Sequence, residues 1–309
     1  MNISLTLSQA IDGYLMHAAA RHLSEDTIRD YSNTFRKFTS FFKTDPPLAS
    51  IDHLQVESFL SQQDGVSNKT LLNYHIGLSA LWTWAVKERI VSEHILRQVT
   101  RPKPEKMEII PFTDLDIRAM ASVLTRSRAY SRPGKRESQH TLRHPERNLA
   151  MFYLLLDTGI RNGELCNMTI RDCDVKNLRI TVFGKGSKER TIPISHRTAQ
   201  VVWRYLSKRP DARLDAPLIA TEHNRPLDRH NVDHILARIG ERAGVPNCHP
   251  HRFRHTFAIL YLRNGGDPFT LQRILGHSTL TMVNRYLSIA QADLATAHRR
   301  ASPVDNLRL

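Results

Sequence analysis

The stretch Arg179-Ile-Thr-Val-Phe-Gly-Lys-Gly-Ser-Lys-Glu-Arg-Thr-Ile-Pro-Ile194 decides the fold class of this chain. Apolar residues alternate with polar ones on both sides of a turn rich in glycine and lysine, Gly184 to Lys188. Alternation with a period of two is typical of half-buried strands, and such a turn between two alternating runs indicates a hairpin. The stretch therefore predicts a small antiparallel β-sheet in a chain whose other apolar periodicity is helical.

Upstream of this hairpin, residues 1–102 are predicted to form a helical domain. Ser24, Asp52 and Ser67 are residue types that cap helix N-termini, and each precedes a run with apolar residues at helical spacing. The run after Ser24 repeats apolar or aromatic residues every three or four positions, at Ile28, Tyr31, Phe35, Phe38 and Phe42. This spacing places them on one face that can be buried in a core.

Three prolines, Pro102, Pro104 and Pro111, then interrupt any helix, so residues 103–112 are predicted to be an extended linker. Residues 113–309 are predicted to form a second domain, in which helices surround the small sheet. The expected fold class is thus mainly α with a small antiparallel β-sheet. A basic stretch, residues 126–147, interrupts the helical pattern of the second domain and is interpreted as a loop.

Charge is the informative part of the composition. The 309 residues include 44 Lys and Arg against 30 Asp and Glu, a formal net charge of +14. Residues 1–100 carry 9 basic and 10 acidic side chains, which leaves 35 basic and 20 acidic ones for the rest. The positive excess therefore lies in the second domain, and a polyanion such as nucleic acid is the expected partner.

The remaining composition excludes two classes of protein. The longest apolar run, Leu149 to Leu156, is far shorter than the ~18 residues that a membrane span needs, so no membrane partner is expected. Three cysteines without a CxxC pair and the lack of a signal-like N-terminus argue against a secreted disulfide scaffold. A cytoplasmic location is expected.

Neither a metal nor a nucleotide is predicted as a cofactor. His251 and His255 have the spacing of two zinc ligands on a helix, but Arg254 would place positive charge beside the metal and no H-E-x-x-H carboxylate is present. The turn at Lys185 also fails as a phosphate loop, because Arg179 stands where its first glycine is required. ATP binding is therefore unsupported.

Polar residues are concentrated in four stretches that otherwise look buried: Thr158–Leu165, Gly184–Arg190, His251–His255 and Leu275–Tyr286. Together these stretches resemble the motifs of the tyrosine recombinase (phage integrase) family, most closely its two-domain Xer-type members. Its Thr-Gly-hydrophobic-Arg-x-x-Glu-Leu box matches Thr158–Leu165, and its Gly-Lys-Gly-x-Lys-x-Arg hairpin matches Gly184–Arg190. Its His-x-x-Arg-His motif matches His251–His255, and its Leu-Gly-His-Ser motif with a tyrosine nine residues after the histidine matches Leu275–Tyr286. Each motif alone is weak, but four in this order are specific.

The resemblance implies a helical, SAM-like core-binding domain followed by an α+β catalytic domain. It implies double-stranded DNA as the substrate and a homotetramer on paired recombination sites, with a paralogous recombinase as a further possible partner. A C-terminal helix in residues 290–309 would dock on a neighbouring subunit. The implied roles are Tyr286 as nucleophile, Arg161 and Arg254 as a phosphate clamp, Lys185 as general acid, His251 and His277 as hydrogen-bonding and proton-transfer partners, and Glu164 as a supporting acidic residue.

The implied reaction agrees with the chemistry of these residues. A phenol has a pKa of about 10, so attack on a phosphodiester requires cationic neighbours and a base. Attack by Tyr286 would give a 3'-phosphotyrosyl link and a free 5'-hydroxyl. Religation would need no ATP, because one phosphoester is exchanged for another of similar energy, and it would need no metal, because the arginines stabilise the phosphoryl charge.

The expected function is site-specific recombination, as in DNA integration, excision or dimer resolution. A type IB topoisomerase-like relaxase and a non-catalytic DNA-binding regulator remain as alternatives. His255 is as compatible with a structural role as with a functional one. Met282, Val283 and Ser288 depart from the residues common in the family near the tyrosine, which leaves site preference open.

Overall fold

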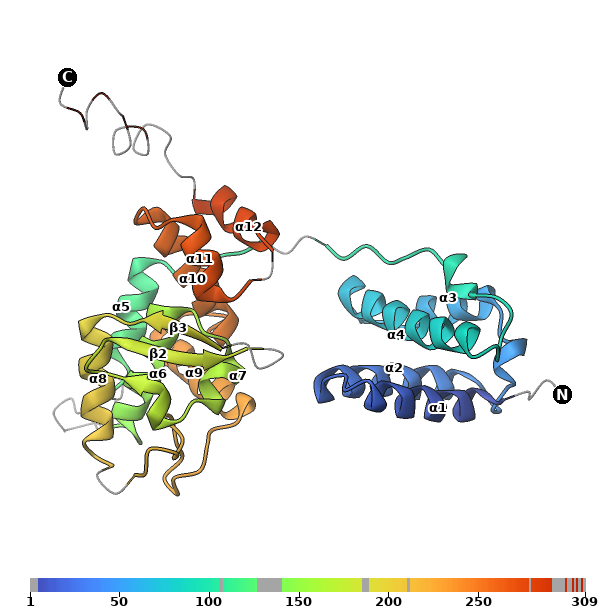
Figure 1. The fold of residues 1–309 in the computed structure, drawn as a ribbon, viewed down its shortest axis with the longest axis horizontal. Helices are drawn as coiled ribbons and strands as arrows, with labels where there is room; N and C mark the ends of the chain where they lie inside the picture. Colours follow the sequence, from blue (N-terminus) through green and yellow to red (C-terminus); the bar gives the residue numbers. More distant parts are fainter. Residues whose placement is uncertain are drawn as a thin grey trace, which may run out of the picture. The chain divides into compact units, whose positions relative to one another are not determined.

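The computed structural model describes residues 5–105, 108–126, 141–184, 189–209, 212–277 and 279–290, together with residues 298, 302, 304 and 307. The chain divides into two compact units, Met1–Met107 and Glu108–Leu309 (Figure 1). Most of the basic stretch 126–147, Lys185, and most of the predicted docking segment 290–309 lie outside the described residues.

The first unit is helical, as the sequence predicts. Ser24, Asp52 and Ser67 are confirmed as N-caps, because the side chain of each accepts a hydrogen bond from a backbone N–H in the first turn of its helix. The unit contains the helices α1 (Leu7–Ala20), α2 (Glu25–Phe41), α3 (His53–Ser61) and α4 (Asn68–Lys87), with short 3-10 turns η1 (Leu48–Ser50) and η2 (Ile95–Arg97).

Aromatic rings fill the core of this unit. Phe35, Phe38, Phe59 and Trp82 are all nearly inaccessible to solvent. Phe38 meets Phe59 and Trp82 edge to face, with ring centroids 5.0 and 6.1 Å apart. Such pairs add about 0.5–1.5 kcal/mol to the stabilisation that comes from burying their area. The core of the first unit therefore depends on rings from α2, α3 and α4.

The sheet of the second unit confirms the predicted hairpin. Strands β1 (Cys173–Asp174), β2 (Arg179–Phe183) and β3 (Glu189–Pro193) form an antiparallel sheet in the order β1-β2-β3. In the register, Ile180 lies opposite Ile192, and Val182 lies opposite Arg190. Ile180, Val182 and Ile192 are buried, so the core-facing side of the sheet also carries the guanidinium of Arg190 toward the protein interior.

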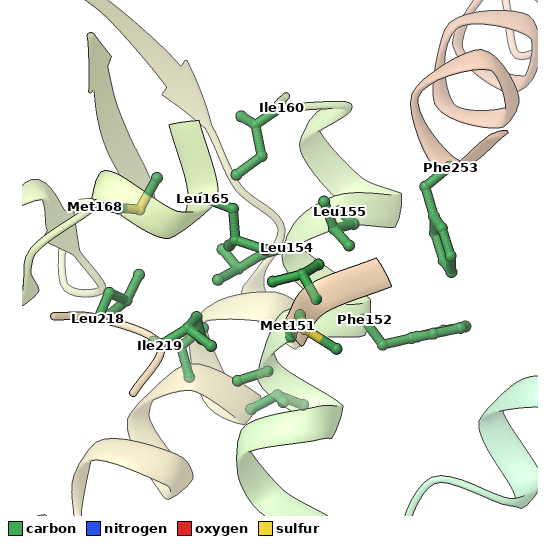
Figure 2. Close-up of a cluster of buried hydrophobic side chains, with 14 of the residues drawn as sticks. Met151, Phe152, Leu154, Leu155, Ile160, Leu165, Met168, Leu218, Ile219 and Phe253 are labelled. Atoms are coloured by element: carbon green, nitrogen blue, oxygen red, sulfur yellow. The ribbon is translucent and has the colours of Figure 1, made fainter. Parts of the chain in front are cut away.

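The buried face of this sheet packs into a core built mainly from helices, among which α6 is central. It packs against α8 and α10, and its residues Met151, Phe152, Leu154 and Leu155 are buried among apolar side chains from several elements (Figure 2). The helices of the second unit are α5 (Asp114–Ser122), α6 (Pro145–Thr158), α7 (Asn162–Asn167), α8 (His196–Leu206), α9 (Arg229–Ala243), α10 (Pro250–Arg263), α11 (Pro268–Leu275) and α12 (Thr281–Ala290), with a 3-10 turn η3 (Ile170–Asp172). The fold class is thus mainly helical with a small antiparallel sheet, as predicted.

The last residues of the predicted linker 103–112 lie within the second unit and pack against α10. The backbone N–H of Phe112 donates to the Thr256 hydroxyl at 2.8 Å, and the Phe112 ring is buried. Arg252 donates to the carbonyl oxygens of Ile110 and Pro111. Residues 110–112 therefore fix the start of the second unit against α10. In the described part of the chain, no helix is both long and apolar enough to span a bilayer.

Replacing the buried Trp82 tests whether the two units unfold separately. Trp82→Ala should lower the free energy of unfolding of the first unit by about 3–5 kcal/mol, since it leaves a large cavity. Hydrogen exchange of the full chain, read by mass spectrometry, should show faster exchange in α2 and α4 and unchanged exchange in α6 and α10.

Trp203→Ala is the matched control, because Trp203 is 59% exposed on α8. It should leave the slowest exchange rates in both units nearly unchanged. Equal acceleration of both units in Trp82→Ala would show that they unfold together.

Candidate functional site

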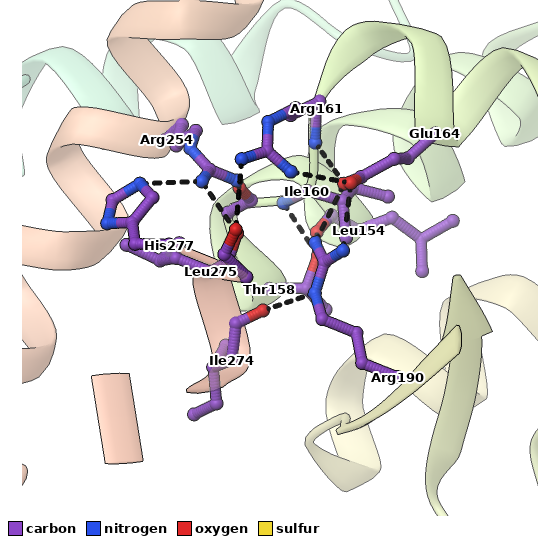
Figure 3. Close-up of polar contacts among 12 residues, drawn as sticks. Leu154, Thr158, Ile160, Arg161, Glu164, Arg190, Arg254, Ile274, Leu275 and His277 are labelled. Carbon is purple, nitrogen blue, oxygen red and sulfur yellow. Dashed lines mark hydrogen bonds and ion pairs between the residues drawn. The ribbon is translucent and has the colours of Figure 1, made fainter. Parts of the chain in front are cut away.

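Five of the residues singled out in the sequence meet at one place in the second unit. Arg161 precedes α7, Glu164 lies in its first turn, Arg254 lies in α10, His277 follows α11, and Tyr286 lies in α12. Figure 3 shows the contacts of Arg161, Glu164, Arg254 and His277.

A buried carboxylate, that of Glu164, connects two arginines. Arg161 donates to it from its backbone N–H at 2.8 Å and from Nη1 at 2.9 Å. Arg190 donates from both terminal nitrogens at 2.8 Å, a two-pronged ion pair. The Glu164 side chain is 5% exposed, so these bonds form away from water, where charge-assisted hydrogen bonds are strong.

The ionisation of Glu164 follows from these contacts. Burial alone would raise the pKa of its carboxyl group, but the hydrogen bonds and charges of Arg190 and Arg161 outweigh that effect and hold the pKa below its usual range. Glu164 is therefore ionised at neutral pH, and it neutralises one of the positive charges around it.

Arg190 belongs to this cluster, although sequence reasoning gave it no role beyond its place in the hairpin motif. Its Nε donates to the Ile274 carbonyl at the end of α11 at 2.7 Å, while its terminal nitrogens bind Glu164. The alternation of residues along β3 could have predicted that Arg190 is largely buried, because Arg190 shares the core-facing side of this strand with Ile192. An arginine on a buried face requires a buried acceptor.

The guanidinium of Arg254 lies between the C-terminal ends of two helices. It donates to the carbonyl of Gly159 after α6 at 2.8 Å and to that of Leu275 in α11 at 2.7 Å. Free carbonyls and the helix dipole make both ends partially negative, which suits a buried cation. Burial, followed by the nearby Arg161, lowers the pKa of Arg254 to about 10, so it stays charged at neutral pH.

His277 is oriented by the same guanidinium. Its Nε2 accepts from Nη2 of Arg254 at 2.9 Å. Burial and then the charges of Arg254 and Arg161 lower the pKa of His277 to about 4, so its ring is neutral at neutral pH and Nδ1 carries the hydrogen. Nδ1 is thus a buried donor without an acceptor among the described residues.

Tyr286 is almost completely buried, at 1% exposure, beside two histidines. Its ring is stacked on that of His277, with centroids 6.3 Å apart and planes 17° apart. Its hydroxyl is hydrogen-bonded to Nδ1 of His255 at 2.9 Å. Burial raises the pKa of Tyr286, and the charges of Arg254, Arg285 and Arg161 act in the opposite direction.

Two predicted site residues, His251 and Lys185, have no described contact with the other five. His251 is exposed on α10, one helical turn before His255, and no described contact joins it to Tyr286. Lys185 lies outside the described residues. Within the described ranges, no group of three or more histidine, cysteine or acidic residues is arranged to hold a metal ion.

Comparison with known proteins agrees with this geometry. Residues 135–293 match the phage integrase family, and residues 11–89 match the N-terminal SAM-like domain of phage integrases. A tyrosine recombinase XerC of Pelobacter propionicus is 26% identical over 304 residues, which cover 96% of each chain.

Two solved structures share the fold. The Tn1549 transposon integrase in complex with transposon right end DNA has a TM-score of 0.73 at 20% identity, covering 96% of this chain and 99% of that one. A lambda integrase tetramer bound to a Holliday junction has a TM-score of 0.70 at 20% identity, covering 92% of this chain and 78% of that one.

The fold and the cluster of arginines, histidines and a tyrosine therefore define a DNA strand-transfer enzyme of the tyrosine type. The chain belongs to the phage integrase family. It is a tyrosine recombinase with Xer-type proteins among its relatives.

Glu164→Gln tests the electrostatic part of the site. The folded-state pKa of Glu164 is lowered, so its carboxylate stabilises the fold above the unfolded pKa of about 4.3, and the contribution is lost as pH falls through the folded pKa. At pH 7 the variant should lose about 3–5 kcal/mol of unfolding free energy, because two arginines lose their shared partner.

Urea unfolding at pH 7 and at pH 3.5 measures this loss, which should be smaller at the lower pH. Glu222→Gln is the control, because its carboxylate is about half exposed beside Arg143 and His144 and should contribute less than about 1 kcal/mol. An equal loss for Glu164→Gln at both pH values would contradict the argument.

Proposed function

We propose that this chain cleaves and rejoins double-stranded DNA at specific sites through a 3'-phosphotyrosyl intermediate formed on Tyr286. One observation carries the proposal: the buried guanidinium of Arg254 binds His277, and the ring of His277 stacks on that of Tyr286. A cation, a neutral hydrogen-bonding ring and a phenol are thereby held next to each other, which is what phosphoryl transfer to a tyrosine needs.

The charges of the site favour a phosphodiester. Arg161, Arg190 and Arg254 contribute three positive charges, and Glu164 neutralises one of them. In this proposal Arg161, whose side chain is 41% exposed, and Arg254 bind the non-bridging oxygens of the scissile phosphate. His277 contributes the unpartnered Nδ1–H as a further donor.

In the proposed cleavage step, the Tyr286 oxygen forms a bond to phosphorus and transfers its proton to a neighbouring base, while the bond from phosphorus to the 5'-oxygen breaks. Lys185 is proposed to protonate that leaving oxygen, and His251 to bind the phosphate from the exposed side of α10. Religation reverses these steps, so no energy source is required.

The active assembly is proposed to be a homotetramer that pairs two duplexes, in the cytoplasm. The lambda integrase tetramer on a Holliday junction supports this number of subunits by analogy of fold. A paralogous recombinase is a further proposed partner. Joining of two labelled duplexes by this chain alone would show that the homotetramer suffices, and a requirement for a second recombinase would show that it does not.

Covalent capture tests the reaction directly. The full chain is incubated with a pool of nicked duplexes of random sequence, and DNA that remains attached to protein in detergent is sequenced. Recovery of one shared site supports a site-specific recombinase, and recovery of unrelated sequences supports a type IB relaxase instead. Binding without any attached DNA would favour a non-catalytic regulator.

Tyr286→Phe should abolish attached DNA while leaving DNA affinity within a few-fold, because the lost hydroxyl is the nucleophile and contributes little to binding. Capture yield and a gel-shift titration on the recovered duplex measure the two quantities. Tyr153→Phe, which alters a partly buried ring on α6, is the matched control and should cleave normally. Attached DNA in Tyr286→Phe would assign the nucleophile elsewhere.

Removal of metals should leave cleavage intact. Because the arginines supply the positive charge that a metal supplies in other phosphoryl-transfer enzymes, capture yields with EDTA and without nucleotide should equal those with magnesium. A strict requirement for magnesium or zinc would contradict this prediction.

A further inference from the structure

The described contact of the Tyr286 hydroxyl is with His255, a histidine other than the two, His251 and His277, that the family resemblance names as proton-transfer partners. Nδ1 of His255 lies 2.9 Å from the phenol oxygen, and the two ring centroids are 5.7 Å apart. His251 lies four residues earlier on the same face of α10 and is exposed. Of these two histidines on α10, His255 is the one that contacts the phenol.

Because the hydroxyl of Tyr286 is buried, removal of its proton requires a contact with a base. The Tyr286 side chain is 1% exposed, so its proton cannot be released directly to water at this position. Removal of that proton requires an acceptor within hydrogen-bond reach. His255 is at that distance.

His255 is in the right form to accept a proton. Burial, then the charges of His251 and Arg254, lowers its pKa to about 4, so it is neutral at neutral pH. A phenol is a stronger acid than the N–H of a neutral imidazole, so the hydroxyl donates to Nδ1 and Nε2 carries the imidazole hydrogen. The charged and titratable groups around His255 are His249, His251 and Arg254 from its own helix and cap, Arg285 and Tyr286 from α12, and His277 after α11.

We propose that His255 is the residue that takes the proton from Tyr286 during DNA cleavage. This inference rests on the proposed function. The O–H bond of Tyr286 breaks, and its proton forms a bond to Nδ1 of His255, giving an imidazolium. The phenolate oxygen forms its bond to phosphorus, and the 5'-oxygen leaves with a proton from the general acid. In religation, the imidazolium returns the proton to the phenol.

The low pKa of His255 in the absence of DNA would keep Tyr286 protonated until a phosphate binds. Without DNA, the positive groups around His255 make it a poor base, and the phenol stays protonated. A phosphate bound between Arg161 and Arg254 brings negative charge beside the same groups, which raises the pKa of His255. The nucleophile is thus activated only when a phosphodiester is in place.

The first test needs no DNA. Nitrogen NMR of the full chain with labelled histidine should show Nδ1 of His255 unprotonated and hydrogen-bonded at pH 7, with hydrogen on Nε2. In Tyr286→Phe, the Nδ1 signal should move to the position of an unprotonated nitrogen without a donor. A protonated Nδ1 facing Tyr286 would overturn the proposal, whether or not the chain cleaves DNA.

The second test measures cleavage of the duplex captured by the unmodified chain. His255→Asn keeps a hydrogen-bonding side chain without a base and should cleave about 10²–10⁴-fold more slowly, with a rate that rises tenfold per pH unit as hydroxide replaces the lost base. His255→Ala should regain activity when imidazole is added. A merely structural role for His255 would produce neither the pH slope nor the rescue.

His251→Ala separates the two histidines. It should lower the rate but keep the pH profile of the unmodified chain, and added imidazole should not restore it. His196→Ala, at an exposed position at the start of α8, should leave the rate unchanged. Rescue and a new pH slope in His251→Ala instead of in the His255 variants would overturn the proposal. No attached DNA with the unmodified chain would refute the proposed function, and the NMR result would still decide the direction of the hydrogen bond.

Discussion

The carboxylate of Glu164 is the contact on which the rest of the site depends. It is nearly inaccessible to water, and it accepts hydrogen bonds from Arg161 next to α7 and from Arg190 in β3. Arg190 in turn binds the last turn of α11 through the Ile274 carbonyl. A hairpin, a short helix and the helix that precedes His277 are therefore fixed relative to each other through one negative charge. Without that charge the two guanidinium groups would repel each other in a region of low polarity, where the repulsion is strong.

Two glycines at the C-terminal ends of α6 and α11 allow the close packing around these arginines. Gly159 and Gly276 end α6 and α11 in the left-handed region, at φ of +59° and +63°, which turns the chain sharply after each helix. A Cβ atom at Gly159 would lie 2.5 Å from the ring of Phe257, and one at Gly276 would lie 3.1 Å from the guanidinium of Arg190. The glycines of the two motifs therefore have a steric reason: Gly159 lets the end of α6 pack closely against Phe257, and Gly276 lets the end of α11 approach the guanidinium of Arg190.

Local sequence patterns were sufficient to predict the fold class. They were insufficient to predict which side chains are buried and which distant residues they contact. The alternation around Ile180 and Ile192 predicted the hairpin, and Ser24 and Asp52 predicted helix starts, because strand period and capping are properties of a few neighbouring residues. The partners of Arg190 are 26 and 84 residues away, so no local pattern identifies them. His251 and His255 share one helical face, and only the packing of α12 against α10 decides which of them contacts Tyr286. The motifs therefore singled out residues that the fold brings together, and tertiary packing set the contacts among them.

In the proposed reaction, the burial of Tyr286 would also affect the lifetime of the bond between the tyrosine and DNA. A phosphodiester between DNA and a tyrosine is an activated ester, and water is the competing nucleophile that would turn a reversible exchange into a permanent strand break. If the bond forms where the phenol lies now, beneath the rings of His255 and His277, few water molecules can reach the phosphorus. The same packing that makes the hydroxyl hard to ionise then protects the broken strand, so that a DNA hydroxyl, and not the solvent, closes it again.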